Sequence, residues 1–228
     1  MKRSREAGQA APIYITMVAG LLFLALALFA VGQAGANHGG AQSAADAAAL
    51  AAAQESRDDF VSVDILGDPG NLLNPEFLDD IFNGDPIGTG IGCQAAERFA
   101  DRNEAVLATE RPDNGCTAMP DRWGFQVHVR TKKPMGATIL PGVADKKAQA
   151  SATAVVESRC DFEPAEDAEE EENPPADGDE SPEEDPDDPE EVSPGSLRCG
   201  GDPWKIDPEH LDLLPDAADL FSVRLAQD

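Results

Sequence analysis

The chain has 228 residues and a formal net charge of −27 at pH 7, with 44 acidic against 17 basic side chains. Such an excess of acid repels the phosphate backbone, so nucleic-acid binding is excluded as a function. With about 40 residues in the apolar N-terminal part, the remainder allows one modest domain plus irregular sequence. A chain of this size leaves little scaffold for an active-site cleft.

The N-terminus predicts a membrane span. Lys2, Arg3 and Arg5 precede a stretch, residues 7–45, that contains no Asp, Glu, Lys or Arg. Within it, residues 10–31 are apolar, and about 20 helical residues suffice to cross a hydrocarbon core of about 30 Å. By the positive-inside rule, residues 1–9 are expected to form a cytoplasmic basic tip, and the C-terminal part is expected outside the cell.

A cleavable secretory signal is the alternative interpretation of the same segment. Ala34, Gly35 and Ala36 have the small-x-small form of a cleavage site, so a secreted protein cleaved after Ala36 remains possible at this point. The apolar run is longer than the roughly 7–15 residues typical of such signals, which favours a permanent anchor. Under both interpretations the rest of the chain lies outside the cytoplasm.

An alanine-rich extension, residues 32–57, follows the span and contains no proline. Alanine has the highest helix propensity, so one continuous helix from about Pro12 to Arg57 is predicted. Gly32, Ala36 and Gly40 recur at four-residue intervals, and small residues at that spacing allow another helix to pack closely. The sequence therefore predicts an extracellular helical extension with a helix-packing face.

The exported head is predicted to be an α+β domain formed by residues 58–160 and 199–228. Its expected strands have alternating or β-branched patterns and give a three-stranded antiparallel sheet with a packed helix. The expected elements are a short helix at 75–81 after the N-cap Asn74, a helix of about three turns from Cys93, and strands at 123–130, 149–157 and 220–225.

Four cysteines, all in the exported part, predict disulfide bonds in an oxidising compartment. Three pairings are possible; Cys93 with Cys116 and Cys160 with Cys199 is favoured because each bond closes a local loop. No Cys-x-x-Cys or Cys-x-x-His spacing supports the alternative of a zinc site, so no metal is predicted there.

Most of the acidic excess lies in one insert, residues 161–198. Between Asp161 and Glu191 there are 18 acidic residues and no Lys or Arg; the rest of the chain has 26 acidic and 17 basic residues, a net −9. Proline density and like-charge repulsion predict a disordered loop. No ordered calcium-binding pattern is present, so a solvated loop that attracts cations weakly is expected.

The usual signatures of catalysis and cofactor binding are absent from the sequence. No nucleophile elbow, zinc-protease helix, Walker loop or dinucleotide fingerprint occurs. The sequence therefore predicts a protein that is not an enzyme, with no catalytic residues, cofactor or metal site.

Two blocks near the N-terminus carry a family resemblance. Residues 8–20, GQAAPIYITMVAG, and residues 39–53, GGAQSAADAAALAAA, together resemble the TadE/TadG-like proteins of the Flp, or tight-adherence, pilus-assembly system in their actinobacterial form. The resemblance covers about residues 4–56. It implies a pseudopilin-like chain: an N-terminal helix held in the membrane, able to pack among pilus subunits, and an exported globular head.

The resemblance also implies a processing site. In processed members a prepilin peptidase cuts after a glycine, which corresponds here to the bond between Gly8 and Gln9, and an aromatic residue follows, here Tyr14. Ile13 stands where those members have Glu. An uncleaved membrane protein is therefore the alternative.

The predicted function is a non-enzymatic, single-pass membrane component of Flp/Tad-type pilus assembly or a related export apparatus. Its expected partners are the lipid bilayer and pilus or pilus-assembly subunits, with the N-terminus cytoplasmic and the head extracellular. A membrane-anchored extracellular binding module with a cation-attracting acidic loop is the alternative, besides the secreted protein cleaved after Ala36.

Overall fold

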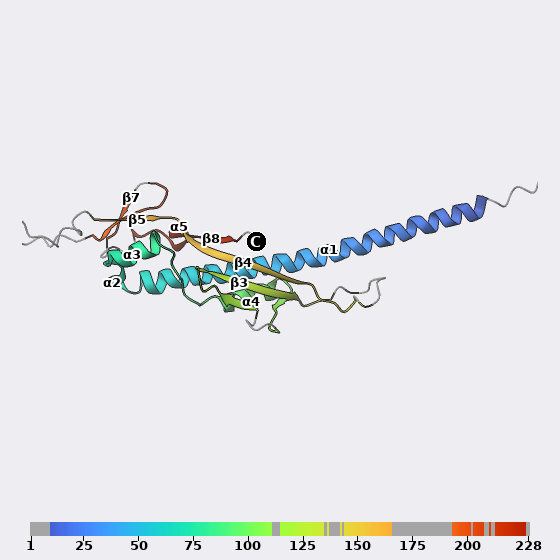
Figure 1. Cartoon of the computed structure of the whole chain (residues 1–228), viewed down its shortest axis with the longest axis horizontal. Coiled ribbons are helices and arrows are strands. Elements are labelled where there is room, and N and C mark those ends of the chain that lie inside the picture. The colour runs from blue at the N-terminus through green and yellow to red at the C-terminus, as the bar shows by residue number, and fades with distance from the viewer. Residues whose placement is uncertain are drawn as a thin grey trace, which may run out of the picture.

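One helix runs through almost the whole length of the molecule (Figure 1). The computed structural model describes residues 10–110, 115–134, 136, 142, 144–165, 193–201, 203–207, 210 and 213–226. Helix α1, Ala10–Phe60, has 51 residues, which at 1.5 Å per residue is about 77 Å. Its N-terminal half projects from the head, and its C-terminal half lies inside it. The predicted continuous helix is confirmed, and its glycines do not interrupt it.

Helix α1 ends in a widened turn, the π-helix η1, Val61–Ile65. The amide of Leu66 closes it by donating to the carbonyl oxygen of Val61 at 2.9 Å. Gly67 then follows, and a Cβ at this position would lie 2.4 Å from the carbonyl oxygen of Val63. Only glycine lets the chain leave the helix this close to its last turn.

The main sheet of the head is antiparallel and has five strands. Its order is β1-β3-β4-β8, and β2 pairs with β3 next to β1. The strands are β1 Ala105–Leu107, β2 Cys116–Ala118, β3 Gly124–Thr131, β4 Gln149–Ser158 and β8 Phe221–Leu225. The α+β class and all three predicted strands are confirmed. The sequence missed β1 and β2, because three residues are too few to show a strand pattern.

Helix α1 packs on the inner face of this sheet. Phe125, Val127 and Val129 of β3 are fully buried on that face, and their cross-strand partners on β4 are alanines. The helix contributes alanines as well, so its backbone approaches the sheet closely. The fully buried alanines of this helix are Ala41, Ala44, Ala45, Ala48, Ala49, Ala52 and Ala53.

The alanine-rich extension is therefore not a separate stalk. The sequence set the start of the head at residue 58, whereas burial begins at Ala41. A run of alanines contains no large apolar residue that would mark a core-facing stripe, so its sequence pattern resembles that of an exposed helix. The second half of α1 is the central helix of the head.

Four aromatic rings close the core where α1 ends. Phe60 and Trp123 lie with ring centroids 5.0 Å apart, and Phe82 stacks on Phe221 at 5.5 Å. Trp123 also meets Phe221 edge-on at 5.2 Å. These contacts join α1, the main sheet and the short helix α3. They lie at the far end of the head, which is the end farthest from the projecting half of α1.

Three shorter helices surround the main helix: α2 Pro69–Leu72, α3 Pro75–Phe82 and α4 Cys93–Arg102. The predicted cap of α3 is confirmed, because the Asn74 side chain accepts hydrogen bonds from the amides of Glu76 at 3.0 Å and Phe77 at 3.2 Å. The predicted helix beginning at Cys93 is confirmed as α4, which packs on α1.

A second antiparallel sheet of three strands lies at the far end of the head, where the sequence predicted none. It contains β5 Asp161–Pro164, β6 Gly195–Arg198 and β7 Pro203–Lys205; helix α5, Ala217–Leu220, leads into β8. β5 and β6 thus occupy the two ends of the predicted acidic insert. The middle of that insert, residues 166–192, lies outside the described residues, so its disorder stays a prediction.

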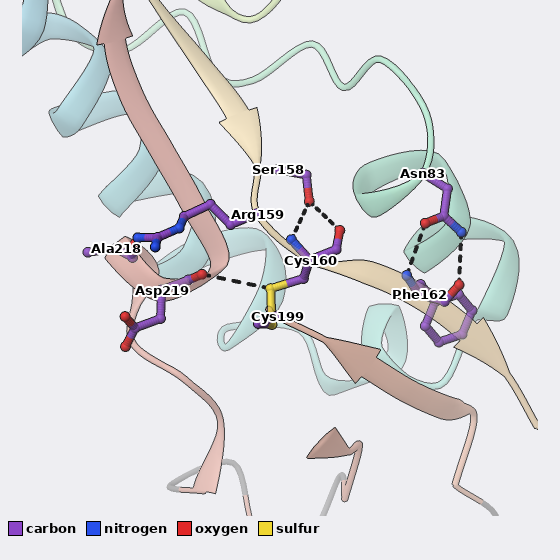
Figure 2. Close-up of a disulfide and its surroundings, with 8 residues drawn as sticks. All are labelled: Asn83, Ser158, Arg159, Cys160, Phe162, Cys199, Ala218 and Asp219. Atoms are coloured by element: carbon purple, nitrogen blue, oxygen red, sulfur yellow. Dashed lines mark hydrogen bonds between the residues drawn. A yellow bond between two sulfur atoms is a disulfide. The ribbon is translucent and has the colours of Figure 1, made fainter. Parts of the chain in front are cut away.

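Two disulfides fasten these parts together, with the predicted pairing. Cys93 of α4 is bonded to Cys116 of β2, and Cys160 to Cys199. Figure 2 shows the second bond between the chain leaving β4 and the end of β6. Beside it, the Asn83 side chain donates to the carbonyl oxygen of Phe162 at 2.9 Å and accepts from its amide at 3.0 Å. The small sheet is thereby held to α3 and to the main sheet.

Candidate functional site: the exposed half of helix α1

The first half of α1 has an unusual surface: it is apolar and almost completely exposed. Its most apolar window of 18 residues has a mean hydropathy of 2.5 and no buried residue. Ile13 and Phe29 are 69% and 70% exposed. A helix of this length and composition can cross a membrane, whereas in water such a surface would be unstable. The exposed apolar segment, Pro12–Val31, is the strongest candidate for a functional surface.

The polar groups of this segment satisfy what a hydrocarbon environment requires. Thr16 is the only hydroxyl side chain between Ile15 and Val31, and its Oγ1 donates to the carbonyl oxygen of Ile13 at 2.9 Å. The helical backbone pairs its own amides and carbonyls. The Tyr14 ring is 70% exposed near the start of the helix, where an aromatic ring can lie at the membrane interface.

Between the apolar segment and the head lies a neck, defined here as Gly32–Gly40. The neck is helical, and a Cβ at Gly32 or Gly40 would meet no atom within 4 Å. Ala36 is exposed as well. The predicted packing face therefore carries no other part of the described chain, and its use by a partner helix stays a prediction. Gly8 and Gln9, the predicted processing site, lie outside the described residues.

The head holds the C-terminal half of α1 through a buried polar contact as well as through alanines. Ser56 is fully buried; its Oγ accepts a hydrogen bond from Trp123 Nε1 at 2.9 Å and donates to the carbonyl oxygen of Thr89 at 2.7 Å. Gly88 crosses the indole so closely that a Cβ there would lie 1.9 Å from Trp123 Nε1. The loop before α4 therefore packs directly on the Trp123 indole. The hydrogen bond between Ser56 and Trp123 links α1 to the residue that precedes β3.

The head surface also has an open hollow of about 720 Å³. Its charged lining includes Asp121, Arg122, Glu157 and Arg224. Arg224 donates through Nε to Glu157 at 2.7 Å, and this hydrogen bond holds the pKa of the Glu157 carboxyl below its ordinary value. Arg122 pairs with Asp121. These four charges form two opposite pairs. The Ser158 hydroxyl of the lining donates to the carbonyl oxygen of Cys160, which is not a base that would activate it as a nucleophile.

The described part of the chain contains no cluster of side chains with metal-binding geometry. No group of three His, Cys, Asp or Glu side chains there comes together as metal ligands would. The four cysteines are engaged in disulfides. The functional surface that stands out is therefore the exposed half of α1.

The fold and this surface define a class: a small disulfide-bonded α+β head carried on one helix that is long and apolar enough to cross a membrane. Residues 8–55 match the family model described as "Putative Flp pilus-assembly TadE/G-like". This confirms the family resemblance on that segment, which covers the apolar segment, the neck and most of the buried alanines. Searches of the curated proteins and of the solved structures give no match.

The family match covers most of α1 and no other element of the head. It begins before the apolar segment and ends at Glu55, next to the buried Ser56. Nearly all of α1 is therefore matched, both the exposed half and the half that forms the centre of the head. The β-strands and both disulfides lie outside the match.

Proposed function

We propose that the protein is a single-pass membrane, pseudopilin-like component of Flp/Tad-type pilus assembly or of a related export apparatus, with a cytoplasmic N-terminus and an extracellular head. The observation that carries the proposal is the coincidence of the family match with one continuous helix, exposed and apolar in its first half and buried in the head in its second. The protein acts through packing, without catalysis.

The continuous helix gives this function a physical basis. Its second half is packed between the main sheet and α4, so the head is fixed to the helix that carries the apolar segment. Its exposed neck presents Gly32, Ala36 and Gly40 on one side, where a second helix can approach closely. Neighbouring pilus or pilus-assembly subunits are the proposed occupants of that face.

The neck also offers a sharp test. All four native cysteines are in disulfides, so an Ala36→Cys variant has one added thiol on the proposed packing face. Ala34→Cys is the matched control: it is equally an exposed alanine, but two residues earlier, about 200° around the helix. Each thiol is alkylated with a maleimide that carries a benzophenone, which inserts into nearby C–H bonds on irradiation, so the partner needs no thiol. Irradiated membranes should give adducts with pilus subunits or with a second copy at position 36 and few at position 34.

Equal adducts at both positions, or none at either, would count against packing through this face. Alkaline extraction of the same membranes tests the anchor separately, because an integral single-pass protein stays in the pellet. The mass and N-terminal sequence of the purified chain test processing: a start at Met1 indicates a permanent anchor, and a start at Gln9 indicates pilin-type processing.

Release by cleavage after Ala36 is a second candidate, and one structural observation favours it. The buried part of α1 begins at Ala41, so a chain starting at Asn37 would keep every buried residue of the head. An N-terminal sequence beginning at Asn37, with the protein in the culture medium, would establish release.

The extracellular binding module is tested by deleting residues 166–191, since such a module should lose a ligand while an assembly component should still insert and fold.

A further inference from the structure

Lysines are concentrated at one place in this acidic protein. The chain has six, and four of them flank the connection between β3 and β4: Lys132, Lys133, Lys146 and Lys147. Only Lys205 lies elsewhere in the head. Arginines are spread over the rest of the head, so the clustering concerns lysine in particular. Four lysines on one connection suggest an electrostatic role for that position.

Contacts between the sheet and α1 show in which direction β3 ends and β4 begins. Trp123, before β3, is hydrogen-bonded to Ser56, and Ser151 in β4 accepts a hydrogen bond from Gln42 Nε2 at 3.2 Å. Ser151, near the start of β4, thus lies beside an earlier residue of α1 than Trp123 does. The end of β3 and the start of β4 are therefore nearer to the apolar end of α1. Figure 1 shows the same direction, with the ends of β3 and β4 directed along α1 toward the projecting half.

The lysines reach the level of the neck. Lys147 lies four residues beyond Ser151, which corresponds to at most about 13 Å along an extended chain. The same distance covers about nine residues of helix, counted back from Gln42. This upper limit puts Lys146 and Lys147 within reach of the neck, on the side of the head from which the apolar segment leaves and where lipid headgroups surround a helix embedded in a bilayer.

Two of the four lysines have ion-pair partners, and the other two have none among the described residues. Lys132 Nζ lies 2.5 Å from Asp101 Oδ1, and Lys133 Nζ lies 3.2 Å from Glu104 Oε2. Lys146 and Lys147 are exposed, and within the described residues neither forms an ion pair. Asp145, the preceding residue, is exposed as well, so this short segment carries one net positive charge toward an external partner.

We propose that Lys146 and Lys147 bind anionic lipid headgroups at the membrane surface beside the neck, and so orient the head. This rests on the proposed function, because it requires α1 to be anchored in the membrane. Each lysine near an anionic surface strengthens the attraction about five-fold, equivalent to about 1 kcal/mol. Lipid is favoured over a protein partner because the lysines lie at the level where the helix enters the bilayer.

The distribution of acid supports an upright head. The strands β5 and β6, which begin and end the acidic insert, lie at the far end, where Asn83 of the α3 cap binds Phe162. Eighteen acidic residues lie between Asp161 and Glu191. Screening limits such forces to about 10 Å in physiological salt, so the acidic end is repelled only when the head tilts far enough to bring it near an anionic membrane.

The test measures lysine reactivity in the full chain reconstituted into vesicles. One preparation contains phosphatidylcholine alone, and the other contains about one-third phosphatidylglycerol. A membrane-impermeant amine reagent is applied, and the modification rate of each lysine is read by mass spectrometry, with Lys205 as the internal control. Anionic vesicles should slow Lys146 and Lys147 about five-fold relative to Lys205, and about 1 M salt should abolish this difference.

Each outcome separates the two proposals. Equal rate ratios in both vesicle types, with the chain floating with the vesicles, would overturn the lipid contact and leave the anchor intact. Failure to float would overturn both. Protection of the two lysines in detergent micelles that rises with protein concentration would overturn the lipid contact in favour of a second copy of this chain.

Discussion

Replacing Ser56 by Ala tests the contact that fixes α1 in the head. The substitution removes one hydroxyl that accepts from Trp123 Nε1 and donates to the carbonyl oxygen of Thr89. Both partners stay in place, and Trp123 is 3% exposed, so water cannot easily replace the lost group. The effect should therefore be larger than that of an ordinary hydrogen bond.

The magnitude follows from the groups left unpaired. A buried donor or acceptor without a partner costs about 1–3 kcal/mol. This cost applies in full to Trp123 Nε1 and only in part to the carbonyl oxygen of the half-buried Thr89. The higher helix propensity of alanine returns about 0.5 kcal/mol. We expect the free energy of unfolding to fall by about 2–4 kcal/mol, which lowers the Tm by roughly 5–15 °C for a head of this size.

The assay is thermal unfolding of the full chain in detergent, followed by circular dichroism and by tryptophan fluorescence. Ser62→Ala is the matched control, because the Ser62 hydroxyl donates only to the exposed carbonyl oxygen of Asp59 at 3.0 Å. That control should change the free energy of unfolding by less than about 0.5 kcal/mol. If both substitutions have the same small effect, the indole contact does not hold α1 in the head.

Three further predictions concern the disulfides, the hollow and α4. Replacing Cys160 and Cys199 together by Ser should cost about 4 kcal/mol in chemical unfolding, because the bond closes a loop with a sequence separation of 39; an unchanged midpoint would refute this. The lowered pKa of Glu157 stabilises the fold above the ordinary carboxyl pKa and is lost as pH falls through the lowered value. Glu157→Gln should therefore slightly reduce the acid dependence of Tm, and an identical profile would contradict that. Gly92→Ala would place a Cβ 2.5 Å from a carbonyl oxygen of α1 and should destabilise by about 1–3 kcal/mol, whereas Gly90→Ala, which meets no atom, should not.

The sequence predicted those parts of the fold whose pattern is local. The alternation in Gly124–Thr131 and the Asn74–Pro75 cap both depend on a few neighbouring residues, and both appear as predicted. The small sheet was missed because Asp161–Pro164 and Gly195–Arg198 pair across the acidic insert, and each strand is only four residues long. Long-range pairing of short strands leaves no periodic signal.

The candidate site was likewise predicted from the sequence only in part. Hydropathy alone identified the exposed apolar segment, since charge and length decide whether a helix can cross a membrane. The role of Ser56 could not be predicted, because a serine after an alanine run shows nothing of an indole 67 positions away in the chain. The burial of Ala41–Ala53 also escaped, since alanine is compatible with both a solvated helix and a closely packed one.

The shared use of α1 by membrane and head restricts where the molecule can bend. From Ala41 onward the helix is enclosed by the main sheet and α4, so its orientation within the head is fixed. In the neck, none of the four glycines has another described part of the chain within 4 Å of a Cβ position. Glycine makes up four of its nine residues, and each weakens a helix by about 1 kcal/mol relative to alanine. We therefore expect any tilt of the head relative to the membrane to be taken up between Gly32 and Gly40. A contact of Lys146 and Lys147 with lipid would act beside this weak segment, where a small force changes the tilt most.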